Sequence, residues 1–184
     1  MTDPRSIMEM DMADTITAEQ LRFVRDLAAP IETVWQYLVD PELRARWFMG
    51  GPTEARVGGP LGMTFRHDDL SDGDVPTPER YAANQGKAWA ETITRIAPPH
   101  LLAFTWSGGD AGEVTIELSD LGNDRTRLVL THTGLRGSAD ARNFGGGWGA
   151  HLDALQKRLA GEPVANFWDL HAAAQGRANE AVGI

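Results

Sequence analysis

The strongest constraint on the fold is a change of hydrophobic period near residue 139. Before this point apolar residues alternate in short segments, whereas after it they recur every three or four residues. The residues of this second stripe are Phe144, Trp148, Leu152, Leu155 and Leu159, with His151 beside it. Such spacing predicts one amphipathic helix, and ~20 residues at ~1.5 Å each make a rod of roughly 30 Å. Only this helix is long enough to cover a small sheet.

The segments before that helix predict antiparallel strands joined by short turns. Apolar residues alternate in each segment, and Gly, Pro, Asn and Asp gather between the segments, as in hairpins. The predicted strands cover residues 21–27, 61–67, 87–96, 101–106, 113–119 and 125–133. After the first strand, Ala29-Pro30 opens one helix, and Asp40-Pro41 ends it and begins another that runs to about Phe48. We therefore expect an α+β fold with a curved antiparallel sheet of about six or seven strands wrapped on the long C-terminal helix, and two short helices after the first strand.

The chain divides into three parts by pattern. Residues 1–16 are polar, acidic and rich in Met without a sustained period, which predicts a flexible N-terminal arm. Residues 17–161 hold the strands and the long helix, and so form the domain. Residues 162–184 are a C-terminal extension, in which the stretch from Phe167 to Ala174 predicts a final short helix.

Composition and motifs exclude several classes of function. Lys and Arg total 17 against 26 Asp and Glu, a formal net charge of −9, which disfavours nucleic-acid binding. The chain has no Cys, so it has no disulfide or thiol chemistry. We find no apolar run that could insert into a membrane and no secretory signal, and expect a cytoplasmic protein. Nucleophile and phosphate-loop signatures are absent from the sequence, so we assign no catalytic residue and no cofactor.

Strand alternation predicts which side chains face the long helix. Most are apolar, and the three polar exceptions are His67, which is closest to the rim, Glu91 and His132. Some of these side chains, together with two side chains of the helix, form the predicted ligand-binding set: Met63, Phe65, Trp89, Glu91, Phe104, Trp106, His132, Trp148 and His151. His67 adjoins the acidic segment Asp68–Pro78, which predicts an exposed loop, so we expect His67 at the rim.

Each polar candidate has a functional and a structural interpretation. His132 could bind a ligand or act as a general base, or it could be a structural histidine near a strand end that hydrogen-bonds to the backbone of the neighbouring helix. Glu91 could bind a ligand hydroxyl or amine, could pair with an arginine, or could lie in water if the strand register differs. Two histidines and one carboxylate, His67, His132 and Glu91, form a plausible metal set. No local ligand spacing supports that set, and we predict no metal site.

Several stretches resemble START-like (SRPBCC) helix-grip domains, in particular the branch of the activator of heat-shock protein 90 ATPase homologues. The opening pattern runs from Phe23-Val24-Arg25 through Ala29-Pro30-Ile31 to Trp47-Phe48. It is followed by the strand–Pro-Pro–strand of residues 96–106, by residues 126–135, and by Gly147-Trp148 with Leu152 and Leu155. The resemblance covers about residues 20–161, and the order and spacing of these motifs together are typical of the fold.

The resemblance implies a hydrophobic cavity between sheet and helix. Its superfamily mostly binds apolar molecules, so we expect this chain to bind a small, mostly hydrophobic molecule such as a lipid, a polyketide or an aromatic metabolite. One alternative is a cyclase, dehydratase or hydrolase in which His132 or Glu91 moves protons. Another is a protein-interaction domain like the chaperone activators. We also expect a homodimer, formed through exposed aromatic residues of the C-terminal extension around Phe167-Trp168. The triple glycine Gly145–Gly147 departs from the pattern and predicts a loosened or close-packed point at the mouth of the cavity.

Overall fold

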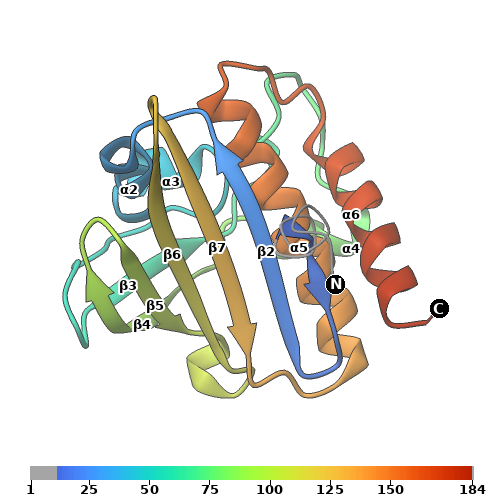
Figure 1. The fold of residues 1–184 in the computed structure, drawn as a ribbon. Coiled ribbons are helices and arrows are strands. Elements are labelled where there is room, and N and C mark those ends of the chain that lie inside the picture. Colours follow the sequence, from blue (N-terminus) through green and yellow to red (C-terminus); the bar gives the residue numbers. More distant parts are fainter. Residues whose placement is uncertain (1–11, 184) are drawn as a thin grey trace, which may run out of the picture.

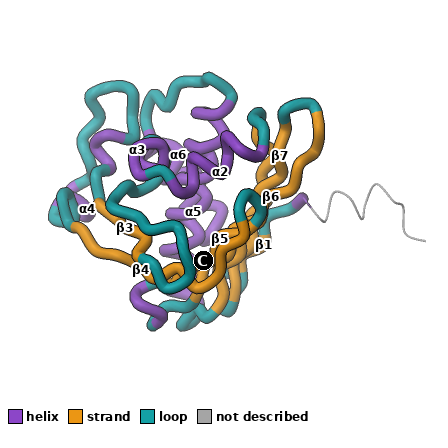
Figure 2. Tube along the Cα trace, turned by 90° about the vertical axis from the view of Figure 1, so that its left-hand side faces the viewer, coloured by secondary structure: helices purple, strands orange, loops and turns teal. Residues whose placement is uncertain are grey.

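A seven-stranded antiparallel sheet curves around a long helix in the computed structural model, which describes residues 12–183 (Figure 1). The strands are β1 (Thr15–Ile16), β2 (Gln20–Leu27), β3 (Pro60–Thr64), β4 (Ala88–Ala97), β5 (Leu101–Thr105), β6 (Glu113–Gly122) and β7 (Arg125–Thr133). Their spatial order is β1-β2-β7-β6-β5-β4-β3. The view in Figure 2 shows the strands bending along one side of the molecule with helix α5 on the inside of the bend. The predicted helix-grip fold is therefore confirmed.

The helices lie on the inner side of the sheet. They are α2 (Ile31–Val39), α3 (Pro41–Ala45), the 3₁₀ turn η1 (His67–Asp69), α4 (Glu79–Ala82), the 3₁₀ turn η2 (Ser107–Gly109), α5 (Ser138–Leu159) and α6 (Phe167–Ala181). Of these, α4 and the two 3₁₀ turns are additions that the sequence patterns did not predict. Asp40 separates α2 from α3, and its carboxylate accepts the backbone N–H groups of Glu42 and Leu43 at 2.9 Å each, as an N-cap does. The sheet curves around the long helix α5, and α6 packs along α5 (Figure 1).

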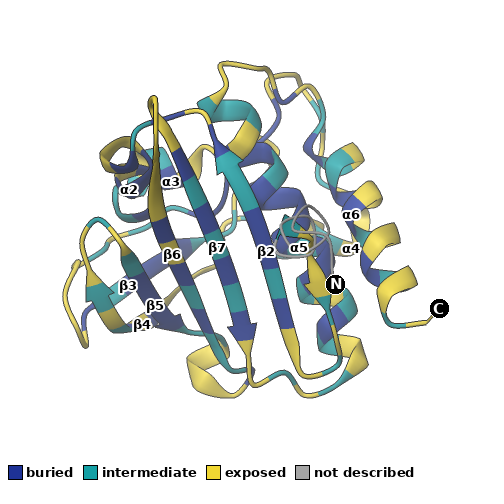
Figure 3. Ribbon diagram, in the orientation of Figure 1, coloured by how far each residue is buried: buried dark blue, intermediate teal, exposed yellow. Residues whose placement is uncertain are grey.

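Burial alternates along the strands as the hydrophobic pattern requires (Figure 3). In β7 every second side chain from Thr126 to His132 is buried. These residues pair with β2 in a continuous register in which Phe23 faces Leu130. Because neighbouring strands share a face at each register position, the inner face becomes one apolar surface against α5.

Two predictions about irregular segments need correction. The flexible arm of residues 1–16 lies mostly outside the described residues, but Thr15–Ile16 form strand β1, since their backbone groups pair with Leu21 and Arg22 of β2. The segment from Asp68 to Pro78 is not exposed throughout, because the side chain of Leu70 is fully buried in the core. Ile16 packs partly buried against the core and Leu70 is fully buried, and a polar composition does not reveal such single apolar contacts.

A buried arginine ties the connection between α3 and β3 to the rest of the fold. Arg44 donates to the carbonyl oxygens of Leu38, Met49 and Gly62 at 3.1, 2.8 and 2.7 Å, and to the hydroxyl of Thr53 at 3.0 Å. Burial lowers the pKa of Arg44 to about 10. The guanidinium thus fixes the backbone on which Trp47, Phe48 and Met49 reach the interior.

Candidate functional site

A small apolar cavity of about 80 Å³ lies where α5 crosses the connection after α3 and the end of β5. Its lining residues come from three separate parts of the chain. They are Phe48, Met49, Trp106, Phe144, Gly147, Trp148 and His151. His151 is the single titratable side chain in this lining.

Four aromatic rings form the walls of the cavity. The ring centre of Phe48 is 5.0 Å from that of Trp148 and 6.4 Å from that of Trp106, and the two indoles are 5.2 Å apart. Phe144 meets Trp106 edge-on at 5.9 Å. Offset and edge-on rings pack densely and hold their places well. The cavity volume is about half of the ~150 Å³ of an engineered cavity that binds benzene.

His132 supports a wall of the cavity, which corrects its predicted role as a ligand contact. Its Nε2 lies 2.8 Å from the carbonyl oxygen of Ala111, and its Nδ1 accepts the indole N–H of Trp148 at 3.2 Å. A carbonyl oxygen only accepts, so the proton of His132 is on Nε2. Both nitrogens are therefore engaged inside the protein. Burial lowers the pKa of His132, which keeps the ring neutral and able to hold Trp148 in position.

Glu91 is also engaged within the protein rather than with the cavity. Only 3% of it is exposed, and its carboxylate accepts the Thr105 hydroxyl at 2.7 Å and the backbone N–H groups of Ser107 and Gly108 at 3.0 Å each. These bonds stabilise the turn at η2 that follows Trp106. The predicted register of Glu91 is correct, but its partner is this turn, because the turn's N–H groups point at the carboxylate.

Four other predicted lining residues lie elsewhere. Met63 and Phe104 are buried in the core, and neither lines the cavity. Phe65 stacks on the ring of His67 at 3.7 Å. Trp89 pairs with Met63, which puts it on the inner face, yet 41% of it is exposed. Alternation gives the face of a residue but does not show how far the helical cover extends.

His67 and His151 form a buried pair that the sequence patterns did not predict. Their Nε2 atoms are 3.2 Å apart, and the Nδ1 of His151 lies 2.8 Å from the carbonyl oxygen of Trp47. Since that carbonyl only accepts, His151 is protonated on Nδ1 and accepts at Nε2 the proton that His67 carries. His67 is 5% exposed, which corrects its predicted place at the rim. Burial lowers the pKa of His67 to about 2 and that of His151 to about 4.

The glycines of α5 have two different functions. A Cβ at Gly145 would lie 3.2 Å from the Cβ of Ala178, and a Cβ at Gly149 would lie 2.9 Å from the Cβ of Ala174. These two glycines therefore let α6 pack closely. Gly147 lies on another face, where an added Cβ meets nothing within 4 Å, and it lines the cavity. Gly147 is thus the point on α5 at which the cavity has spare room.

Sequence reasoning identified Trp106, Trp148 and His151 as lining residues and missed the other four. Phe144 and Gly147 carried a signal, since both lie on the helical segment that was expected to cover the sheet. Phe48 and Met49 had none, because the connection that holds them has no hydrophobic period. Their position depends on the bonds of Arg44.

Across residues 12–183, no group of three or more His, Asp or Glu side chains has an arrangement that could hold a metal ion. Within the same residues, no helix has the length and apolar character needed to cross a membrane.

The chain is similar to a solved structure of substantial sequence identity. The solution structure of the protein encoded by gene BPP1335 of Bordetella parapertussis is 38% identical, with a TM-score of 0.76, and the match covers 90% of this chain and 87% of that one. The crystal structure of CalU16 from Micromonospora echinospora is 23% identical, with a TM-score of 0.64 over 91% of this chain and 90% of that one. The Aha1 dimer from Colwellia psychrerythraea is 15% identical, with a TM-score of 0.56 over 76% and 95%. The last two show similarity of fold alone.

A family model provides the assignment. No curated protein sequence is significantly similar to the chain. The model of the activator of Hsp90 ATPase homolog 1-like proteins, in contrast, matches residues 28–160, from the end of β2 to the end of α5. This range includes every residue of the aromatic cavity and leaves α6 outside. The chain therefore belongs to the family of activator of Hsp90 ATPase homolog 1-like proteins.

Proposed function

We propose that this protein binds a small, compact, mostly hydrophobic molecule in the cavity between α5 and the sheet. The observation that carries the proposal is the apolar cavity itself, which four aromatic rings surround and which Gly147 leaves without a side chain on one wall. Apolar pockets with few polar groups are the usual form of small-molecule sites. Burial of apolar area there contributes about 25 cal/mol per Å² before association costs.

The volume favours a compact ligand among the expected classes. About 80 Å³ accommodates a small group or, after one wall adjusts, a single ring. A lipid chain or a polyketide is several times larger. An aromatic metabolite or a short branched chain therefore fits the cavity better than either of these.

The alternatives receive less support from the described residues. The enzymatic alternative relied on His132 and Glu91, and both side chains are bonded to other parts of the protein. The homodimer relied on exposed aromatic residues in the C-terminal extension, but Phe167 is fully buried and Trp168 stacks on Tyr81 at 5.2 Å. That aromatic patch is covered by the chain's own domain. The protein-interaction alternative has no particular surface in its favour.

Substitution of Gly147 tests the proposal. We expect xenon, which enters small apolar cavities, to shift the NMR signals of the Trp106 and Trp148 indole N–H groups. Gly147→Leu places a side chain into the open space and should abolish these shifts. Gly176→Leu is the matched control, because Gly176 is a helical glycine that also has nothing within 4 Å but lies in α6 away from the cavity. If the two indole signals respond equally in all three proteins, or in none, the cavity is not the binding site.

A further inference from the structure

A second hollow lies on the other side of one cavity wall. It has a volume of about 340 Å³ and lies between α3, the connection at Gly50-Gly51, the end of β3 and η1. Phe48 lines both this hollow and the aromatic cavity, and no other residue is common to the two linings. Phe48 therefore borders both spaces.

The backbone on both sides of Phe48 is fixed, while its ring is held only by packing. The N–H of Phe48 donates to the carbonyl oxygen of Arg44 at 2.9 Å. The next carbonyl, that of Met49, accepts Arg44 Nε at 2.8 Å. Beyond it, Gly51 packs so closely that an added Cβ would lie 2.6 Å from the carbonyl carbon of Gly62. A ring on an anchored backbone can move by rotation about its side-chain bonds alone, and such motions need no unfolding.

The outer hollow has the polar character that the inner cavity lacks. Glu42, Arg66 and Asp69 line it and are exposed, and Thr64 adds a hydroxyl. Charges of both signs lie in this one space, so a ligand head group with a full charge would meet at least one like charge. A head group that both donates and accepts hydrogen bonds, such as an alcohol or an amide, is matched to such a lining.

We propose that the hollow and the cavity are the two halves of one binding site, with Phe48 as the partition that a ligand displaces. The ligand class is an uncharged amphiphile in which an apolar group of about one aromatic ring is joined by a short linker to an alcohol or amide. The ring takes the place of the Phe48 side chain and packs against Trp106 and Trp148, and the head group remains beside Glu42 and Arg66. Joined, the two spaces reach the ~300–1,000 Å³ that is typical of ligand pockets. This proposal rests on the function proposed above.

The test compares three probes by isothermal titration calorimetry: toluene, 3-phenylpropan-1-ol and 3-phenylpropanoate. The wild-type protein should bind the alcohol more tightly than toluene or the carboxylate. Phe48→Ala should tighten the binding of the alcohol at least tenfold, since the Phe48 ring no longer has to be displaced. Because this truncation can impair folding, a second variant, Glu42→Gln with Arg66→Met, changes exposed side chains only. This double variant should weaken the binding of the alcohol several-fold and leave the binding of toluene unchanged.

The outcomes separate this proposal from the one on which it rests. If toluene binds and Gly147→Leu abolishes that binding, but neither Phe48→Ala nor the double variant changes the preference for the alcohol, the cavity is a ligand site and the two-part site is wrong. If none of the probes binds to the wild type or to Phe48→Ala, and xenon leaves the indole signals unchanged, both proposals fail. A carboxylate that binds more tightly than the alcohol also overturns the assigned ligand class.

Discussion

At the scale of single residues, most buried polar side chains are bonded to neighbours, and the exceptions among the described residues are the Nδ1 of His67 and the Nε1 of Trp168. His67 and His151 illustrate such bonding, since one proton lies between their Nε2 atoms and a second lies between His151 and the carbonyl oxygen of Trp47. Aromatic rings surround the pair, with Phe48 at 4.9 Å from His151 and Phe167 at 5.5 Å from His67. A charged imidazolium would lose both water and this bonding pattern there. The two histidines are therefore neutral in the folded protein.

This arrangement predicts acid sensitivity. The folded-state pKa values of about 2 for His67 and about 4 for His151 lie below the ~6.5 of an unfolded chain. As the pH falls below about 6.5, the unfolded state binds protons that the folded state cannot, so stability decreases by up to about 1.4 kcal/mol per pH unit for each histidine. Urea denaturation between pH 7 and pH 4.5 measures this slope.

Two variants assign the slope to the histidine pair. His67→Phe should be less stable at pH 7, because the Nε2 of His151 loses its donor. Its free energy of unfolding should also decrease less steeply as the pH falls, since one of the two histidines no longer contributes to the slope. His100→Gln changes an exposed histidine and should keep the wild-type slope. A slope that is the same in His67→Phe as in the wild type would contradict the assignment.

At the scale of elements, one face of α5 is built for α6 and another for the cavity. Gly145 and Gly149 are four residues apart and meet Ala178 and Ala174, which are also four residues apart. Residues with this spacing lie on one side of a helix, so small residues from both helices meet along a single line. Gly147 falls between them in sequence and faces open space instead.

Alanine substitutions at these two positions should therefore have opposite signs. Gly147→Ala gains helix propensity without a clash and should stabilise the protein by up to ~1 kcal/mol. Gly149→Ala has the same propensity gain, but its Cβ would lie 2.9 Å from that of Ala174, and overpacking should give a net loss of about 1–2 kcal/mol. In an Ala174→Gly background the loss at Gly149 should disappear. Chemical denaturation of the four variants checks this, and equal effects at both positions would show that packing against α6 is not close.

The elements that the sequence predicted well are those with a regular period. The alternation in the strand of residues 101–106 and the stripe of α5 placed Trp106, Trp148 and His151 correctly, because a period fixes which side of an element a residue occupies. It could not place Phe48, which reaches the cavity from an irregular connection held by Arg44. It put Glu91 on the correct face, but the N–H groups that bind it belong to a turn distant in sequence. Roles of polar residues depend on such distant partners, and one sequence does not reveal them.

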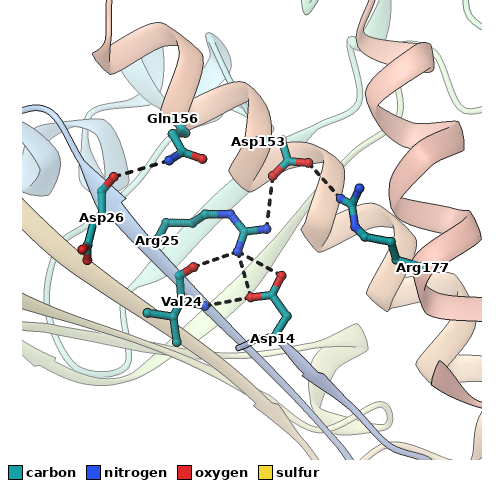
Figure 4. A network of polar contacts seen from close by, with 7 residues as sticks. All are labelled: Asp14, Val24, Arg25, Asp26, Asp153, Gln156 and Arg177. Atoms are coloured by element: carbon teal, nitrogen blue, oxygen red, sulfur yellow. Dashed lines mark hydrogen bonds and ion pairs between the residues drawn. The ribbon is translucent and has the colours of Figure 1, made fainter. Parts of the chain in front are cut away.

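At the scale of the whole molecule, a polar network joins both ends of the described chain to the sheet and the long helix. The guanidinium of Arg25 in β2 contacts Asp14, which precedes β1, at 2.8 Å, and Asp153 in α5 at 3.1 Å (Figure 4). Asp153 also accepts from Arg177 in α6 at 2.9 Å. The side chain of Arg25 is largely buried, whereas that of Arg177 is half exposed. Asp153 is thus the point at which sheet, α5 and α6 are held together.

This difference in burial predicts unequal effects of two substitutions. Asp153→Asn leaves the buried Arg25 with Asp14 as its remaining carboxylate and should cost about 1–2 kcal/mol of unfolding free energy, between the values for exposed and buried pairs. Arg177→Gln breaks only the exposed ion pair with Asp153 and should lower the free energy of unfolding by less than about 0.5 kcal/mol, an effect that high salt removes. Denaturation at low and high salt measures both values. Hydrogen exchange of Asp153→Asn should show faster exchange in β1 and in α6 together, because both elements lose the same anchor. Faster exchange confined to α6 would mean that Asp14 alone holds the N-terminal strand.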